Sequence, residues 1–223
     1  MSRSLPALSP GGHHDADQVL RYCPRILFAA RQTIDAGDLP PAKLFLVERG
    51  FALLVADRPG WRRPIILSIA GPGVVLPPLA PGERLGGLTE TVIIAVPGSA
   101  RDRLLALPEI AAALVEGLLD ALCERQESFA NATGGRHEER LRSTLYQLAR
   151  AHGKVCREGI EIDLPLTHDL LAQMIGCARE TVTNTLARFQ RDGLLTRNGR
   201  GYRLTIPPTA LEPTPGHPAH AQS

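Results

Sequence analysis

The strongest pattern of apolar and polar positions lies near the C-terminus, between residues 166 and 206. Its first helix has one apolar face, formed by Leu170, Leu171, Met174 and Ile175. Thr167 precedes this helix as a candidate N-cap, and Asp169 lies in the first turn, where a negative charge suits the positive end of the helix dipole. Gly176 ends the helix.

A second helix is expected to begin near Ala178 and to stop at Gly193. Val182, Leu186 and Phe189 stand at i, i+4 and i+7 and form its buried stripe. Its other faces carry the polar residues Arg179, Glu180, Thr183, Asn184, Arg188 and Arg191. Two short helices joined by a tight turn predict a helix-turn-helix.

Two strand candidates follow the second helix, at residues 194–196 and 202–206. Between them, Asn198-Gly199 is a strong signal for a β-hairpin turn. A helix-turn-helix followed by a hairpin predicts a winged helix-turn-helix.

Two segments of this unit are the most specific: Ile-Gly-Cys-Ala-Arg-Glu-Thr-Val at 175–182 and Leu-Ala-Arg-Phe-Gln-Arg-Asp-Gly-Leu-Leu at 186–195. They resemble the DNA-binding end of the CRP/FNR (catabolite activator protein) family of bacterial transcription regulators. The resemblance implies that Arg179 and Glu180 read base edges. The family usually has a second base-reading Arg four residues after the Glu, and here Asn184 takes that place, which leaves the half-site sequence open.

The chemistry of the second helix suits a major groove. Arg can bridge O6 and N7 of guanine, Glu can accept from N4 of cytosine, Asn can pair with adenine, and further arginines neutralise phosphates. From residue 169 to 205 the basic residues are Arg179, Arg188, Arg191, Arg197, Arg200 and Arg203, and the acidic ones are Asp169, Glu180 and Asp192. We expect DNA contacts from Thr167, His168, Arg179, Glu180, Thr183, Asn184, Arg188 and Arg200. The alternative is a ligand-sensing or protein-interaction module that does not itself bind specific DNA.

The N-terminal half shows short apolar runs separated by Gly and Pro turns. The strand candidates are residues 26–29, 43–47, 51–56, 65–69 and 92–96. Short strands at such regular intervals predict a β-barrel or jelly roll. The segment resembles the cyclic-nucleotide-binding-type β-roll that forms the sensor half of the same family, most closely from Leu44 to Gly50.

The phosphate cassette of the cyclic-AMP-binding members is not matched. In those members Gly-Glu is followed about ten residues later by Arg-Ser or Arg-Thr; the Arg neutralises the phosphate and the Glu holds the ribose hydroxyl. Here Gly71-Pro72-Gly73 leads into residues 74–79 without a carboxylate, and the stretch 85–99 after Gly82-Glu83 contains no Arg. Because a buried phosphate needs a cation, we expect this pocket to be lost or repurposed.

A long helix is expected after Pro108, over residues 109–131. Its apolar residues are Ile110, Leu114, Val115, Leu118, Leu119, Leu122 and Phe129. This stripe is wider than one barrel needs, so one edge could pair with a second copy as a coiled coil, as the resemblance also implies. The alternative is a helix that packs only on its own barrel.

The sequence thus predicts an α+β chain with a cyclic-nucleotide-binding-like β-roll, a dimerisation helix and a winged helix-turn-helix. The expected boundaries are a disordered tail at 1–18, the β-roll at 19–108, the dimerisation helix at 109–133, the DNA-binding domain at 134–206 and a disordered tail at 207–223. The resemblance implies that the expected partners are double-stranded DNA, a second copy and RNA polymerase.

Composition and motifs argue against several other classes of protein. A formal net charge of +2 over 223 residues argues against a chain that coats nucleic acid along its whole surface. The sequence has no Walker loop, G-x-S-x-G or H-E-x-x-H, so an enzyme is not expected. The apolar run 110–123 is broken by Glu116 and Asp120, so no membrane span is expected.

The cysteines argue against clustered metal sites and disulfides. Cys23, Cys123, Cys156 and Cys177 lie far apart without a C-x-x-C pair, so reduced thiols in a cytoplasm are expected. No iron–sulfur cofactor or metal is expected, whereas haem, which needs only one or two axial ligands, stays open, as does an unknown effector.

Overall fold

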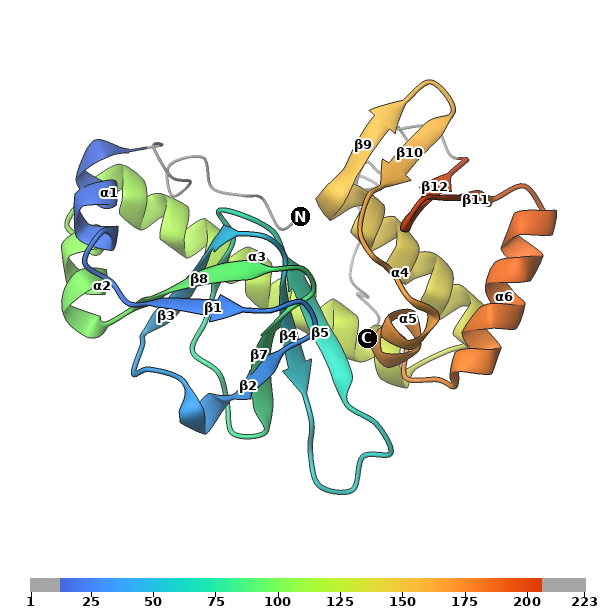
Figure 1. The fold of residues 1–223 in the computed structure, drawn as a ribbon, viewed down its shortest axis with the longest axis horizontal. Coiled ribbons are helices and arrows are strands. Elements are labelled where there is room, and N and C mark those ends of the chain that lie inside the picture. The colour runs from blue at the N-terminus through green and yellow to red at the C-terminus, as the bar shows by residue number, and fades with distance from the viewer. Residues whose placement is uncertain (1–12, 206–223) are drawn as a thin grey trace, which may run out of the picture.

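The computed structural model describes residues 13–205, and its N-terminal half is a roll of two four-stranded antiparallel sheets (Figure 1). One sheet has the order β1-β8-β3-β6 and the other β2-β7-β4-β5. The strands are β1 Arg25–Phe28, β2 Thr33–Asp35, β3 Leu44–Arg49, β4 Ala52–Ala56, β5 Ile65–Ala70, β6 Val75–Leu76, β7 Glu83–Gly87 and β8 Thr91–Val96. The predicted β-roll is confirmed.

Strand β3 shows why the roll reads as continuous apolar runs. Phe45 and Val47 point into the core between the two sheets. Leu44 and Leu46 point to the other face and pack with helices that cover it. Both faces of the strand are therefore buried, and the alternation typical of a half-exposed strand is lost.

Strands β2, β6 and β7 were not predicted from the sequence, because they are short or rich in polar residues and glycine. Strand β7 begins with Glu83-Arg84 and ends with Gly86-Gly87. A Cβ on Gly86 would stand 2.4 Å from the carbonyl oxygen of Gln32. Glycine is needed in this strand because a neighbouring backbone approaches closely. Residue propensities for strands do not reflect such a contact.

The predicted disordered tail at 1–18 is wrong where the structure describes it, because helix α1 spans His14–Leu20. Ala16, Val19 and Leu20 are buried against α2, α3 and the outer face of the roll. Tertiary packing stabilises this seven-residue helix, which is too short to form alone. Residues 1–12 and the predicted tail at 207–223 lie outside the described residues.

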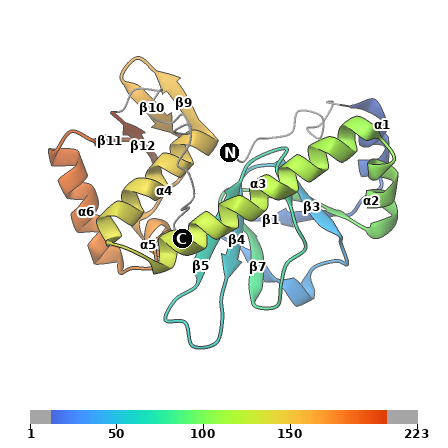
Figure 2. The same ribbon diagram turned by 180° about the vertical axis from the view of Figure 1, so that it is seen from behind.

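Three helices follow the roll: α2 Gly98–Leu105, α3 Pro108–Thr133 and α4 His137–His152. The helix α3 begins with Pro108 in its first turn and crosses the roll before it reaches the C-terminal half (Figure 2). Ile110 and Leu114 pack against the roll. Val115, Leu119 and Leu122 of the same predicted stripe remain exposed.

The C-terminal half contains α5 His168–Met174, α6 Arg179–Arg191 and a four-stranded sheet of order β11-β12-β10-β9. Its strands are β9 Gly153–Cys156, β10 Gly159–Ile162, β11 Leu195–Asn198 and β12 Gly201–Leu204. Asn198 pairs with Gly201, so the loop of the wing is Gly199-Arg200 rather than Asn198-Gly199. Gly199 has φ of 54°, which a first loop position of a tight hairpin requires.

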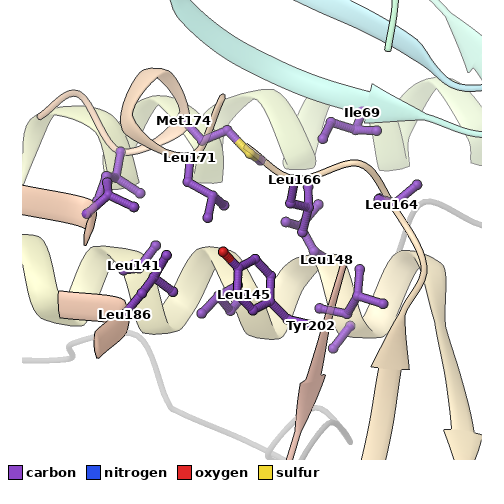
Figure 3. Packing of buried hydrophobic residues seen from close by; sticks show 14 of the residues in the cluster. Ile69, Leu141, Leu145, Leu148, Leu164, Leu166, Leu171, Met174, Leu186 and Tyr202 are labelled. Atoms are coloured by element: carbon purple, nitrogen blue, oxygen red, sulfur yellow. The ribbon is translucent and has the colours of Figure 1, made fainter. Parts of the chain in front are cut away.

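One apolar core joins the two halves (Figure 3). Ile66 and Ile69 of β5 belong to the same cluster as Leu164, Leu166 and Leu171 of the C-terminal half. In Figure 3, Ile69 lies across from Leu164 and Leu166, above the row of leucines on α4. The winged helix is therefore packed against the roll and is not connected to it by a flexible linker alone.

Polar contacts border this shared core. Nε2 of His152, at the end of α4, lies 2.8 Å from the carbonyl oxygen of Ile69. The His152 ring meets the ring of Phe51 edge-on, with 5.4 Å between centroids. Burial lowers the pKa of His152, and the bond to Ile69 opposes this effect only in part.

Acidification should weaken the fold at His152. Because the folded-state pKa lies below the unfolded value of about 6.5, the unfolded chain takes up the proton first. The stability that neutral His152 contributes is complete above that value and is lost as the pH falls below it. Between pH of about 7.5 and 5.5, the unfolding midpoint in thermal denaturation should fall further for the native protein than for His152→Gln. Equal decreases would show that His152 does not report on this interface.

Candidate nucleic-acid interface

Helix α6 is held by one face and free on the other. Val182, Leu186 and Phe189 are buried in the shared core. On the opposite face Glu180 and Asn184 are exposed to solvent. The helix therefore presents a polar surface whose orientation is set by its apolar side.

The turn between α5 and α6 has a defined geometry. The hydroxyl of Thr167 accepts a hydrogen bond from the backbone N–H of Leu170 at 3.1 Å, which makes Thr167 the N-cap of α5. Helix α5 ends at Met174, and Gly176 adopts φ of 61°. A Cβ at Gly176 would stand 2.3 Å from the carbonyl oxygen of Ala132, near the end of α3.

The first flank of α6 faces α5. The hydroxyl of Thr183 donates to the carbonyl of Arg179 at 3.0 Å and lies 2.8 Å from Nδ1 of His168. With the single hydroxyl proton on that carbonyl, Nδ1–H of His168 is the donor to Thr183. Arg179 also pairs with Asp169 at 3.7 Å. Burial, and then the charges of Arg197 and Arg179, lower the pKa of His168.

The second flank of α6 faces α4. Arg188 forms an ion pair with Glu138, which also lies 3.6 Å from Arg142. The guanidinium of Arg142 stands over the ring of Phe189, 5.5 Å from its centroid. Arg188 is thus partnered by a carboxylate in the absence of DNA.

The wing places further cations beside α6. Arg200 lies exposed at the tip of the β11–β12 hairpin. Arg197 is also exposed, and its guanidinium stands 5.7 Å from the centroid of the Tyr202 ring. Arg191 and Arg197 were not in the predicted set of contacts. Arg191 lies eleven residues after Glu180 and seven after Asn184, so helical spacing alone could have placed it on the same face. Arg197 lies on β11, and its position beside α6 could not be predicted without the strand register.

A second site to consider in the roll is the Gly82-Glu83 pair, where the phosphate cassette was predicted to be lost or repurposed. Glu83 is buried, with 3% of its side chain exposed, and forms an ion pair with Arg125 of α3. Its other oxygen accepts from the backbone N–H of Ala80 at 2.9 Å. The adjacent Arg84 instead pairs with Asp57 at 3.1 Å. The buried carboxylate is therefore neutralised by the protein's own long helix.

The described residues lack two other kinds of site. Within residues 13–205, no group of three His, Cys, Asp or Glu side chains could hold a metal ion. No helix in this part of the chain is long and apolar enough to cross a membrane.

Comparison with known proteins gives relatives for both halves. Residues 139–211 match the family model of the Crp-like helix-turn-helix domain. The CRP-like cAMP-activated global transcriptional regulator of Mycobacterium tuberculosis is 26% identical over 185 residues, which cover 80% of this chain and 82% of that protein. The regulatory protein CysR of Synechococcus elongatus is 35% identical over 81 residues, 35% of this chain and 39% of its own.

Solved structures share the fold. A CooA mutant from Carboxydothermus hydrogenoformans has a TM-score of 0.72 at 20% identity, over 87% of this chain and 88% of its own. A cyclic nucleotide-binding domain containing protein from Listeria monocytogenes has a TM-score of 0.71 at 16% identity, over 86% of this chain and 98% of its own.

A β-roll joined by a long helix to a winged helix with a free polar face defines a transcription regulator with a helix-turn-helix DNA-binding domain. Residues 139–211 belong to the Crp-like helix-turn-helix domain family, and the chain as a whole is similar to a CRP-like transcription regulator over both halves.

The contact between Gly176 and α3 generates a stability prediction with an internal control. Gly176 and Gly193 both have positive φ, 61° and 72°, but a Cβ at Gly193 would meet nothing within 4 Å. Gly193→Ala should cost about 1 to 2 kcal/mol of unfolding free energy, the cost of left-handed backbone alone. Gly176→Ala should cost clearly more, because the turn or the end of α3 must move. Urea unfolding measures the unfolding free energy of both variants. Equal losses would mean that the turn at Gly176 accommodates the added Cβ without cost.

Proposed function

We propose that the protein is a homodimeric, sequence-specific regulator that inserts one α6 helix from each copy into successive major grooves of a near-palindromic site. The observation that carries this proposal is the exposed polar face of α6, fixed by the burial of Val182, Leu186 and Phe189 on the other side. A rigidly seated helix with Arg, Glu and Asn on its free side has the donors and acceptors that base edges require.

Base reading is assigned to Arg179, Glu180 and Asn184. Glu180 and Asn184 lie on the exposed face, and Arg179 lies in the first turn, where recognition helices approach the bases. Its pairing with Asp169 is long and exposed, so it costs little to exchange for guanine.

Backbone contacts are assigned to the two flanks and the wing. Arg188 and Arg200 supply charge for phosphates, with Arg188 leaving Glu138 when DNA arrives. Thr167, His168 and Thr183 lie at the junction of α5 and α6, where His168 and Thr183 bind each other. We assign these three to positioning contacts with the sugar-phosphate backbone.

The second copy is supported by the exposed edge of α3. Val115, Leu119, Leu122 and Phe129 have 54%, 57%, 52% and 45% of their surface exposed in the isolated chain. Large apolar side chains gathered on one helix edge are typical of an interface. Pairing of two such helices gives the twofold symmetry that a near-palindromic site mirrors, with half-sites about 34 Å apart.

Independence from cyclic AMP is part of the proposal. The mycobacterial relative is named as cAMP-activated. In this chain residues 74–79, directly after Gly73, carry no carboxylate, and the buried Glu83 already binds Arg125 and the Ala80 amide. A nucleotide phosphate placed there would have to displace an internal ion pair, at the cost of leaving a buried charge unpaired.

As a regulator on DNA, the protein would also contact RNA polymerase, and we include this partner in the proposal. The competing function is a ligand-sensing or protein-interaction module without specific DNA binding. The seated polar helix favours the first function over the second.

Selection from random double-stranded DNA should return inverted half-sites. On the selected site, Arg179→Ala should lose about 1 to 3 kcal/mol and relax choice at one base position, because a bidentate guanine contact disappears. Glu180→Ala should mainly reduce discrimination between sequences. Binding to all single-base variants of the site measures both effects.

Arg200→Ala is the matched control for Arg179→Ala. It also removes one exposed arginine, but it should weaken binding to all sequences alike and reduce the salt dependence by about one unit of slope. If Arg179→Ala behaves in the same way, its base-reading role is wrong. If no fragment is preferred even at low salt, the protein is not a sequence-specific regulator.

Cyclic AMP should bind weakly or not at all, because Glu83 is already neutralised by Arg125 and bonded to the Ala80 amide. Isothermal calorimetry should detect no micromolar binding by the intact protein, with the cAMP-activated mycobacterial relative as the positive control. A micromolar dissociation constant would overturn this part of the proposal.

A further inference from the structure

The exposed edge of α3 has a regular spacing that extends beyond its large apolar residues. The exposed positions at alternating steps of three and four residues are Ala112, Val115, Leu119, Leu122, Gln126, Phe129 and Thr133. This is the 3.5-residue repeat of a coiled-coil seam, with Val115, Leu122 and Phe129 at d and the others at a. The buried positions Leu114, Ala121 and Ala132 lie on the other side of the helix, against the same chain.

Gln126 is the one long polar side chain in this seam. Its neighbours all find partners in their own chain: Arg125 binds Glu83, Glu127 accepts from Gln147 at 2.8 Å, and Asn131 donates to Gln147 at 3.1 Å. Within residues 13–205, no hydrogen bond is recorded for the amide of Gln126. It stands exposed between Leu122 and Phe129.

We propose that Gln126 sets the register and the parallel orientation of the dimer by bonding to Gln126 of a second copy. This inference rests on the proposed dimer through α3. In an in-register parallel pair, a twofold axis brings each a position opposite itself. A carboxamide carries both donors and an acceptor, so two copies of it satisfy each other. In a pair slipped by one heptad, one Gln126 amide would face Leu119 and the other Thr133, so the two amides could no longer bond to each other. In an antiparallel pair, a positions face d positions, which are apolar in this seam.

The consequence for DNA follows from how α3 ends. Ala132, about one turn after Phe129, lies against Gly176 in the turn that precedes α6. A slip of one heptad along the seam would displace one recognition helix by about 10 Å relative to the other. Such a dimer could not match the half-site spacing of the correct one. Register in α3 therefore determines the spacing between half-sites.

The test uses an engineered cross-link in the full chain. Ala112→Cys places a thiol at the first a position of the seam, two heptads before Gln126. Cys123→Ser removes the exposed native thiol on this helix. In the parallel in-register dimer the two introduced thiols face each other, so mild oxidation should link most of the protein. The variant Gln126→Leu is then added, with Gln126→Asn as the conservative variant and Asp120→Leu as an equally apolar change outside the seam.

With Gln126→Leu, the dimer should persist, and its dissociation constant should fall by about tenfold, because a buried amide no longer opposes association. The in-register cross-linked fraction should nevertheless drop several-fold, and selected DNA sites should show more than one half-site spacing. Gln126→Asn and Asp120→Leu should keep one cross-linked species and one spacing. Circular dichroism checks that each variant is folded.

The two proposals fail in different ways. If the native protein sediments as a monomer at all concentrations, the dimer itself is wrong. If it sediments as a dimer, while Gln126→Leu keeps the full cross-linked yield and a single half-site spacing, the dimer stands and Gln126 does not set its register.

Discussion

The structure depends on one shared apolar core between β5 of the roll and the helices of the DNA-binding half. Ile66 and Ile69 come from the roll, and Leu145, Leu171 and Leu186 come from α4, α5 and α6. Arg63 adds a polar tie, because its guanidinium donates to the carbonyl of Cys177 at 2.9 Å. Domains within a chain usually move relative to each other unless a large apolar interface joins them. Because such an apolar core joins the two halves here, the orientation of α6 depends on the whole chain.

Three parts of the surface of helix α3 have different surroundings. Ile110 and Leu114 pack against the roll, Arg125 neutralises Glu83 in the roll's interior, and Val115, Leu119 and Leu122 stay exposed. The same helix ends against the turn before α6. A change in how α3 lies on the roll would therefore move α6, and the ion pair between Glu83 and Arg125 opposes such a change.

The sequence predicted the periodic elements well and the non-periodic ones poorly. The winged helix could be predicted from the sequence because Thr167, Gly176 and the apolar stripe through Val182 each carry a local signal. Helix α1 and strand β7 carry none, since tertiary packing stabilises the first and close backbone approach at Gly86 shapes the second. The pairing of Glu83 with Arg125 joins residues 42 positions apart, and no spacing rule could have found it.

The recognition surface is balanced by carboxylates before any DNA arrives. Arg179 has Asp169 on one flank and Arg188 has Glu138 on the other, whereas Glu180 and Asn184 on the central face have no such ion pair among the described residues. Binding of Arg188 to a phosphate must therefore exchange one anionic partner for another, which limits the gain from that contact. The central face gives up nothing comparable when it meets base edges. Discrimination should accordingly depend more on Glu180 and Asn184 than their small share of the surface suggests.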